Sequence, residues 1–270
     1  MNINSYITYD LPVPYKNLLF YPVNLKEYSL FLTYSQCLTF IKNDIPDVKI
    51  ISMNDLEFIF YSATNGKEGD LPYLLLFDRL LSLCLKDDTS FENIEESLKR
   101  YGYDENRKPF FVIGGEKYNN EDFEKIRYII SEQNSLELPD KMISKEVRDS
   151  LEKAQEYKEK HSGQKPGSLE DYIISLATAT GWSFEYIYSL TIRKFIKSVK
   201  RMDNLIHYKI FLNASLTGFT ELKDKSVIKH WLSDIEEDEK YKDVSLDLNE
   251  VENKISMDEA KERESQKYNE

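Results

Sequence analysis

Apolar residues recur at helical spacing along most of the chain. In residues 192–202 they occupy positions i, i+3, i+4, i+7 and i+10, which predicts the apolar face of a helix (Ile192, Phe195, Ile196, Val199 and Met202). Residues 74–85 are apolar nearly all round, so we expect a helix at the centre of a core. Residues 144–160 carry abundant Glu and Lys and few apolar positions, which predicts a solvent-exposed helix. A last long helix is expected over residues 203–216.

Three short stretches predict strands instead. Residues 11–15 contain two prolines two positions apart, which favours extended backbone, and residues 18–23 read as a short aromatic strand. In residues 110–118 two apolar runs flank Gly114 and Gly115, the composition of a tight hairpin. The predicted fold class is therefore α+β and predominantly α-helical, with small N-terminal strand and hairpin elements, two helical units and a flexible acidic C-terminal tail.

Capping residues indicate where several helices begin and end. Polar clusters at residues 52–55 and 120–122 each precede an apolar helical pattern. Ser168 and Asp171 have the spacing of a capping box, and Gly181 stands where a helix end needs a left-handed residue.

Breaker residues and charge divide the chain. The run of Ser, Gly, Gln, Lys and Pro at residues 161–168 predicts a flexible loop. Residues 234–270 hold 14 acidic and 6 basic residues, so they carry −8 of the total charge of −12. We expect an N-terminal mixed helical domain over residues 1–105, a helical domain opened by the hairpin over residues 106–232, and an acidic flexible tail over residues 233–270.

Composition narrows the class of protein. A chain of 270 residues that is 41% hydrophobic and 13% aromatic can bury a sizeable core, and a charge of −12 argues against binding to nucleic acid or anionic membrane. Residues 71–85 fall short of the about 20 apolar residues that span a bilayer, so we expect a soluble, cytosolic protein. Cys37 and Cys84 lie in apolar contexts; two reduced buried thiols are the favoured interpretation, and a single disulfide stays open.

No motif for catalysis or for a cofactor occurs in the sequence. His161, His207 and His230 have no second His or Cys one turn away, and His207 with Asp203 favours a surface hydrogen bond over a metal site. The glycine pair at residues 114–115 is not a phosphate-binding loop, and no nucleophile motif is present. We therefore predict no catalytic, cofactor-binding or metal-binding residues, and a protein that is not an enzyme.

Residues 183–201 superficially fit a helix-turn-helix DNA reader. Five basic residues and no acidic ones occur in residues 191–201 (Arg193, Lys194, Lys197, Lys200 and Arg201). These charges alternate with the apolar face, so a helix with a solvated back explains them as well. The acidity of the whole chain favours the solvated helix.

One motif resembles a known family. The sequence Thr180-Gly-Trp-Ser-Phe-Glu-Tyr-Ile-Tyr-Ser-Leu-Thr191 is similar to a pattern in tail assembly chaperones and related small tail proteins of bacteriophages. In that pattern a helix stops at Gly, Trp packs in the turn, and a short helix leads to a third. Residues 209–218 and residues 11–23 also resemble tail proteins of phages that infect Gram-positive hosts.

The resemblance implies a function in tail assembly. Such chaperones hold the long tape measure protein soluble and help to recruit tail tube subunits, without catalysis, in the host cytoplasm. The expected partners are therefore the tape measure protein and the tail tube protein, and self-association stays open. The alternatives are a structural tail or baseplate protein retained in the virion and, third, a DNA-binding regulator. For Gly181, Trp182 and Ser183, a role in local folding is favoured over a role in binding.

The acidic tail supplies candidate partner-binding residues. Apolar side chains there are spaced so that part of the tail could form one helical stripe (Leu246, Leu248, Val251, Ile255 and Met257). Such a stripe suits reversible contact with an extended helical client, because charge keeps the complex soluble. A solvated tail without a partner explains the same residues equally well.

Overall fold

A computed structural model describes residues 3–65, 72–86, 100–141, 143–161, 167–216 and 230–233. Helices dominate these residues, with two small antiparallel sheets, which confirms the predicted fold class. The described residues fall into two compact units. The larger contains the described residues up to 141 and from 167 to 233, and the smaller contains one described helix, α9 (Lys145–His161).

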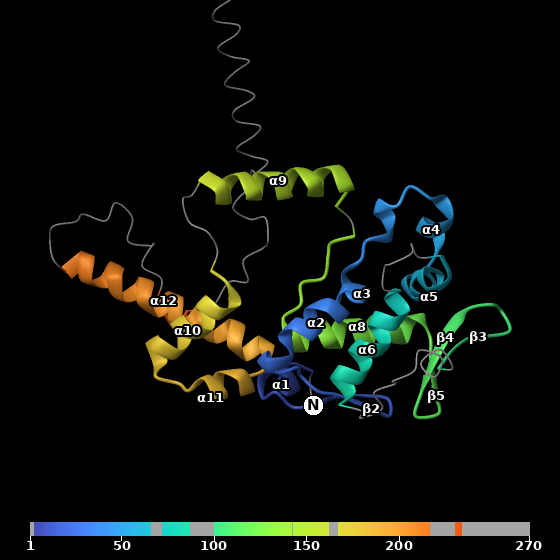
Figure 1. Ribbon diagram of the computed structural model, residues 1–270, viewed down its shortest axis with the longest axis horizontal. Coiled ribbons are helices and arrows are strands. Elements are labelled where there is room, and N and C mark those ends of the chain that lie inside the picture. The colour runs from blue at the N-terminus through green and yellow to red at the C-terminus, as the bar shows by residue number, and fades with distance from the viewer. Residues whose placement is uncertain are drawn as a thin grey trace, which may run out of the picture. The chain divides into compact units, whose positions relative to one another are not determined.

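The N-terminal part of the larger unit contains the following elements, in chain order: α1 (Ile3–Thr8), β1 (Val13–Tyr15), β2 (Leu18–Phe20), the 3-10 helix η1 (Leu25–Glu27), α2 (Tyr28–Tyr34), α3 (Gln36–Thr39), the 3-10 helix η2 (Lys42–Asp44), α4 (Val48–Ser52), α5 (Asp55–Asn65) and α6 (Tyr73–Leu85) (Figure 1). The strands β1 and β2 pair antiparallel, with Val13 opposite Phe20. Helix α1, which the sequence did not predict, precedes the extended segment at residues 11–15.

The rest of the larger unit is a hairpin sheet followed by helices. Its elements are β3 (Tyr101–Tyr103), β4 (Pro109–Ile113), β5 (Glu116–Tyr118), α8 (Asn120–Asn134), α10 (Leu169–Thr180), α11 (Phe184–Ser189) and α12 (Ile192–Leu216). The three strands form an antiparallel sheet in the order β3-β4-β5. Gly114 and Gly115 both have positive φ, 58° and 80°, in the turn between β4 and β5, so the predicted hairpin is confirmed.

The main core forms around α6, as its all-round apolar pattern predicts. No residue of α6 is exposed. Phe77 is fully buried and makes edge contacts with Phe111 of β4 and Phe123 of α8, with ring centroids 5.3 and 5.2 Å apart. The core thus joins residues on both sides of the boundary expected near residue 105, and the pairing of β3 with β4 also crosses it.

A second, smaller core lies among α10, α11 and α12. Its buried residues include Ile173 and Leu176 of α10, Ile187 of α11 and Phe195 of α12, and Leu25 of η1 completes it. Because these helices bury few residues each, much of their surface stays open to solvent.

Backbone hydrogen bonds attach this helical group to the N-terminal segment. The Leu25 amide donates to the Leu190 carbonyl at 2.8 Å, and the Ile192 amide donates to the Val23 carbonyl at 3.0 Å. Nearby, Thr191 donates from Oγ1 to Asp10 at 3.1 Å. Both sides of the junction are held through main-chain groups, so the attachment depends little on which side chains occupy it.

Helix α12 corrects one prediction. The sequence suggested one helix ending near residue 202 and another over residues 203–216, but α12 is continuous from Ile192 to Leu216. Asp203 lies within the helix and pairs with His207 one turn later, with Oδ2 3.5 Å from Nδ1, instead of capping a new helix. No Gly or Pro interrupts the segment, so nothing breaks the backbone ladder there.

Two cap positions shift slightly from those expected. Helix α8 is capped by Asn119, one residue before the predicted cluster, in a capping box with Asp122. Asn54 caps α5, since it accepts from the Glu57 amide at 2.8 Å, whereas Ser52 ends α4. The box of Ser168 with Asp171 and the left-handed Gly181, with φ of 73°, are confirmed.

Candidate protein-binding surfaces

Five aromatic side chains, which we call the aromatic surface, are exposed on α10, the turn after it and α11. They are Tyr172, Trp182, Phe184, Tyr186 and Tyr188, and between 37% and 49% of each residue is exposed. The second core takes Ile173 and Leu176 from α10 and Ile187 from α11, and none of the five rings is among the residues packed in it. Of the five, Trp182 and Tyr186 contact each other, and large aromatic groups that meet in solvent mark a candidate interaction site.

The turn between α10 and α11 fixes where the aromatic surface lies. Gly181 takes the left-handed conformation that ends α10, and the Trp182 amide donates to Thr180 Oγ1 at 3.2 Å. Ser183 then caps α11 by accepting from the Tyr186 amide at 3.2 Å. Trp182 meets Tyr186 edge to face, with centroids 5.1 Å apart at 84°. The motif that the sequence singled out therefore builds a rigid turn and leaves its rings in solvent.

The basic residues at the start of α12 are largely engaged within the protein. Lys194 pairs with Asp10 at 2.8 Å, and Arg193 donates to the Ile7 carbonyl at 3.3 Å. Arg201 donates to the carbonyls of Trp231 and Ser233 at 2.8 and 2.6 Å. These contacts give three of the five charges a structural role, which weakens the interpretation of the segment as a DNA reader.

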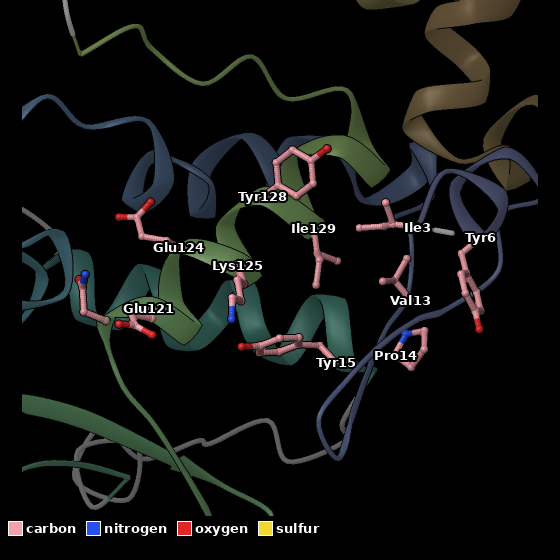
Figure 2. A pocket seen from close by; sticks show the side chains of 11 residues that line it. Ile3, Tyr6, Val13, Pro14, Tyr15, Glu121, Glu124, Lys125, Tyr128 and Ile129 are labelled. Carbon is pink, nitrogen blue, oxygen red and sulfur yellow. The ribbon is translucent and has the colours of Figure 1, made fainter. Parts of the chain in front are cut away.

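A second candidate surface is an open groove of about 850 Å³ between α1, β1 and α8 (Figure 2). Figure 2 shows Ile3, Tyr6, Val13 and Pro14 gathered at one end and the charged side chains of α8 toward the other. The lining residues are Ile3, Tyr6, Val13, Pro14, Tyr15, Asn120, Glu121, Glu124, Lys125, Tyr128 and Ile129. The lining combines apolar and aromatic side chains with three charged side chains of α8, Glu121, Glu124 and Lys125.

Hydrogen bonds hold the polar end of this groove. The Tyr15 hydroxyl donates to Asp122 Oδ1 at 2.6 Å, and Lys16 pairs with the same oxygen at 2.8 Å. Burial would raise the pKa of Asp122, but the hydrogen bonds from Lys16 and Tyr15 hold this pKa below its ordinary value. Burial and the bond to Asp122 raise the pKa of Tyr15. Both groups therefore keep their ordinary charge at neutral pH and serve to position β1 on α8.

The residues considered for metal binding lie apart. His207 pairs with Asp203 on the exposed face of α12, and the His230 ring contacts Tyr208, with centroids 5.2 Å apart. His161 ends α9. Within the described ranges there is no group of three or more His, Cys, Asp or Glu side chains that could hold a metal ion.

Cys37 and Cys84 are both buried and both free thiols, as the favoured interpretation predicted. Burial raises the pKa of each thiol, so neither has the character of a reactive thiolate.

In the part of the chain that the structure covers, no helix has both the length and the apolar character to cross a membrane. The partner-binding candidates Leu246, Leu248, Val251 and Ile255 lie outside the described residues.

The sequence indicated one of the two surfaces and missed the other. The Thr180–Thr191 motif drew attention to Trp182, although the sequence favoured packing of its ring in the turn. The groove was missed, because Tyr15 and Tyr128 are more than a hundred residues apart in sequence. Pairing the extended segment at residues 11–15 with a particular face of α8 requires a tertiary contact that no local pattern encodes.

Comparison with known proteins gives a match over the segment that contains the aromatic surface. Residues 158–236 match the family model described as the YomV second domain, a family associated with phages and prophages. No curated protein and no solved structure matches the chain. The match includes α10, α11 and α12 with the motif at residues 180–191 and leaves the N-terminal part outside. Residues 158–236 are therefore similar to a domain of a phage-associated family.

Proposed function

We propose that the protein is a non-catalytic phage tail assembly protein, which chaperones the tape measure protein and helps to recruit tail tube subunits around it. The observation that carries this proposal is the aromatic surface, because four of its five exposed rings lie within the motif at residues 180–191 that resembles tail assembly chaperones. The similarity of residues 158–236 to a phage-associated domain supports the phage context.

The chemistry of the aromatic surface suits a chaperone. Tyr and Trp offer large, rigid contact areas with a polar atom at the edge, so they bind apolar segments without demanding one partner shape. A client that is long and helical presents apolar stripes that aggregate when left uncovered. Covering such stripes reversibly keeps the client soluble until the tail tube assembles.

Co-expression tests the proposal. The tape measure protein of the same phage is produced alone and together with this chain, and its soluble fraction is measured. We expect the chain to raise the soluble fraction and to co-purify with the tape measure protein. A tape measure protein that stays equally insoluble in both cases would contradict the proposal.

Two other functions predict different outcomes. A structural tail or baseplate protein would be found by mass spectrometry in purified particles, whereas a chaperone leaves before the particle is complete. A DNA-binding regulator would bind duplex DNA with an affinity that falls steeply as salt rises. The engagement of Arg193, Lys194 and Arg201 within the protein favours the assembly function over the regulator.

A further inference from the structure

The apolar stripe of α12 continues beyond the core that it serves. Ile192 and Phe195 are buried in the first turns, and Val199 and Met202 are partly buried against the second core. The next stripe positions, Ile206 and Ile210, are 44% and 56% exposed. Figure 1 shows α12 running on past α10. The exposure of Ile206 and Ile210 shows that the stripe, buried in the first half of α12, is open to solvent in its second.

The opposite side of α12 is covered in part. Residues 230–233 lie against it: Arg201 donates to the carbonyls of Trp231 and Ser233, and the His230 ring contacts Tyr208. At about 100° per residue, Arg201 and Tyr208 fall on the side of the helix away from Ile206 and Ile210. We call the side of the helix that carries Ile206 and Ile210 the distal α12 face.

Charge indicates what kind of partner fits the distal α12 face. Helix α12 carries six basic residues and one acidic residue, in a chain whose net charge is −12. On the helical wheel Lys200 and Lys209 fall on opposite edges of the stripe. Asp203, the acidic residue, lies on the stripe itself and is paired with His207. A row of exposed isoleucines bordered by lysines is complementary to an apolar stripe bordered by carboxylates.

We propose that the distal α12 face binds an acidic amphipathic helix of a partner protein. The partner helix would lie along α12 beyond α10 and extend the packing of α10 on α12 by one more helix. Side chains at helical spacing on a straight helix are matched by another helix, whose ridges fit the same grooves. The inference rests on the proposed function, in which the client is a long helical protein, and it names the class of client segment.

Two synthetic peptides test the inference without any phage protein. Both have 18 residues and the same leucine stripe at helical spacing, and the remaining positions are Glu and Gln in one and Lys and Gln in the other. Each carries a fluorescent label, and its anisotropy is measured as the full-length chain is added. We expect the acidic peptide to bind, more tightly at low salt, and the basic peptide to bind at least tenfold more weakly.

Matched variants locate the binding. The double variant Ile206→Glu/Ile210→Glu should weaken binding of the acidic peptide at least tenfold. The control Val48→Glu/Ile51→Glu adds the same charges at exposed positions of α4, 84% and 45% exposed, and should bind like the wild type. The variant Lys200→Glu/Lys209→Glu should reduce the preference for the acidic peptide. Equal binding of both peptides, or full binding by Ile206→Glu/Ile210→Glu, would overturn the inference.

The same experiment distinguishes other occupants of the distal α12 face. If light scattering shows a dimer that Ile206→Glu/Ile210→Glu converts to a monomer, a second copy covers the face and the inference is wrong. If the acidic peptide binds only to a chain truncated after Ser233, the chain's own residues cover it, and the inference is again wrong. A chain that keeps the tape measure protein soluble but binds neither peptide would retain the proposed function and lose this inference.

Discussion

Arg127 donates a hydrogen bond from Nη1 to Asp55 Oδ2 at 2.8 Å, and the two side chains are only 2% and 5% exposed. This pair joins α8 to the start of α5 across 72 residues of sequence. Lys141 also contacts the same carboxylate oxygen, and the Arg127 guanidinium lies 5.8 Å from the Phe40 ring centroid. Among the described residues Arg127 Nε and Nη2 have no hydrogen-bond partner, and Glu124 Oε2 lies 3.6 Å from Nη1, so Asp55 is the closer of two carboxylates at the guanidinium.

Substituting Asp55→Ala should destabilise the protein strongly. The change removes the hydrogen-bonded carboxylate from a buried guanidinium and leaves only Glu124, whose Oε2 lies 3.6 Å from Nη1; breaking one side of a buried ion pair costs up to about 3–5 kcal/mol. Urea unfolding measures the loss in free energy of unfolding. As a control, Asp203→Ala removes an exposed carboxylate from its pair with His207 and should cost at most about 0.5 kcal/mol. Equal losses for both variants would show that the Arg127–Asp55 pair contributes little.

Acid should destabilise the fold, in part through Asp122. Burial would raise its pKa, yet hydrogen bonds from Lys16 and Tyr15 hold the pKa of this carboxyl below its ordinary value. For a lowered pKa, the stabilisation is present above the unfolded value of about 3.9 and is lost as pH falls through the folded value. Asp55 has the same sign, because Lys141 and Arg127 outweigh the effect of burial on its pKa.

Glu124 contributes to the free energy of unfolding with the opposite pH dependence. Burial raises the pKa of Glu124, so its contribution to stability is present below the unfolded pKa and is lost as pH rises through the folded pKa.

The contribution of Asp122 is tested by its removal. We expect the free energy of unfolding to fall more gently between pH 5 and about 3 in Asp122→Asn than in the wild type. Tyr15→Phe, which removes one donor to Asp122, should show part of the same change. If the free energy of unfolding of Asp122→Asn falls with pH as steeply as that of the wild type, Asp122 does not contribute to the loss of stability in acid.

Neighbouring residues of α11 should differ sharply in their effect on stability. Ile187 is fully buried in the second core, and truncating a buried Ile to Ala costs about 2–5 kcal/mol. Phe184 is 47% exposed on the aromatic surface, so Phe184→Ala should change the free energy of unfolding by at most about 0.5 kcal/mol. Urea unfolding of the two variants measures the difference. Comparable losses would mean that Phe184 belongs to the core and is not available to a partner.

The sequence predicted elements whose signals are local. The all-round apolar pattern identified α6, the Glu- and Lys-rich pattern identified α9, and Gly181 identified the end of α10. The break expected at Asp203 was wrong, because the same residue type caps a helix or pairs within one. Strand β3 was missed since three residues, Tyr-Gly-Tyr, have no recognisable alternation without β4 beside them.

The candidate surfaces depended on contacts between distant residues. The sequence favoured packing for Trp182, because large aromatic residues near a helix end are more often buried than exposed. Whether its ring is covered depends on how few residues α10 and α11 bury against α12, which is a tertiary property. The groove at Tyr15 and the Arg127–Asp55 pair likewise join segments far apart in sequence.

Truncation after Ser233 should leave the melting temperature nearly unchanged. The removed residues carry a charge of −8 and sparse apolar side chains, a composition that does not build a packed core. The same truncation should weaken association with the tape measure protein if the stripe at Leu246, Leu248, Val251 and Ile255 contacts it. Thermal unfolding and co-purification measure the two effects. If the truncated chain unfolds, the removed residues are part of the core. If it binds the tape measure protein as well as the full chain does, the removed residues are not part of the interface.

The most direct test of the chaperone function is the soluble fraction of the tape measure protein when it is co-expressed with variants of the aromatic surface. The variant Trp182→Ala/Tyr186→Ala removes two exposed rings that contact each other. Its matched control, Tyr9→Ala/Tyr103→Ala, removes two rings that are 68% and 61% exposed elsewhere. We predict that the wild type and the control keep the tape measure protein soluble, and that Trp182→Ala/Tyr186→Ala, folded by circular dichroism, does not. Equal solubility with all three chains would contradict the assignment of chaperone function to the aromatic surface.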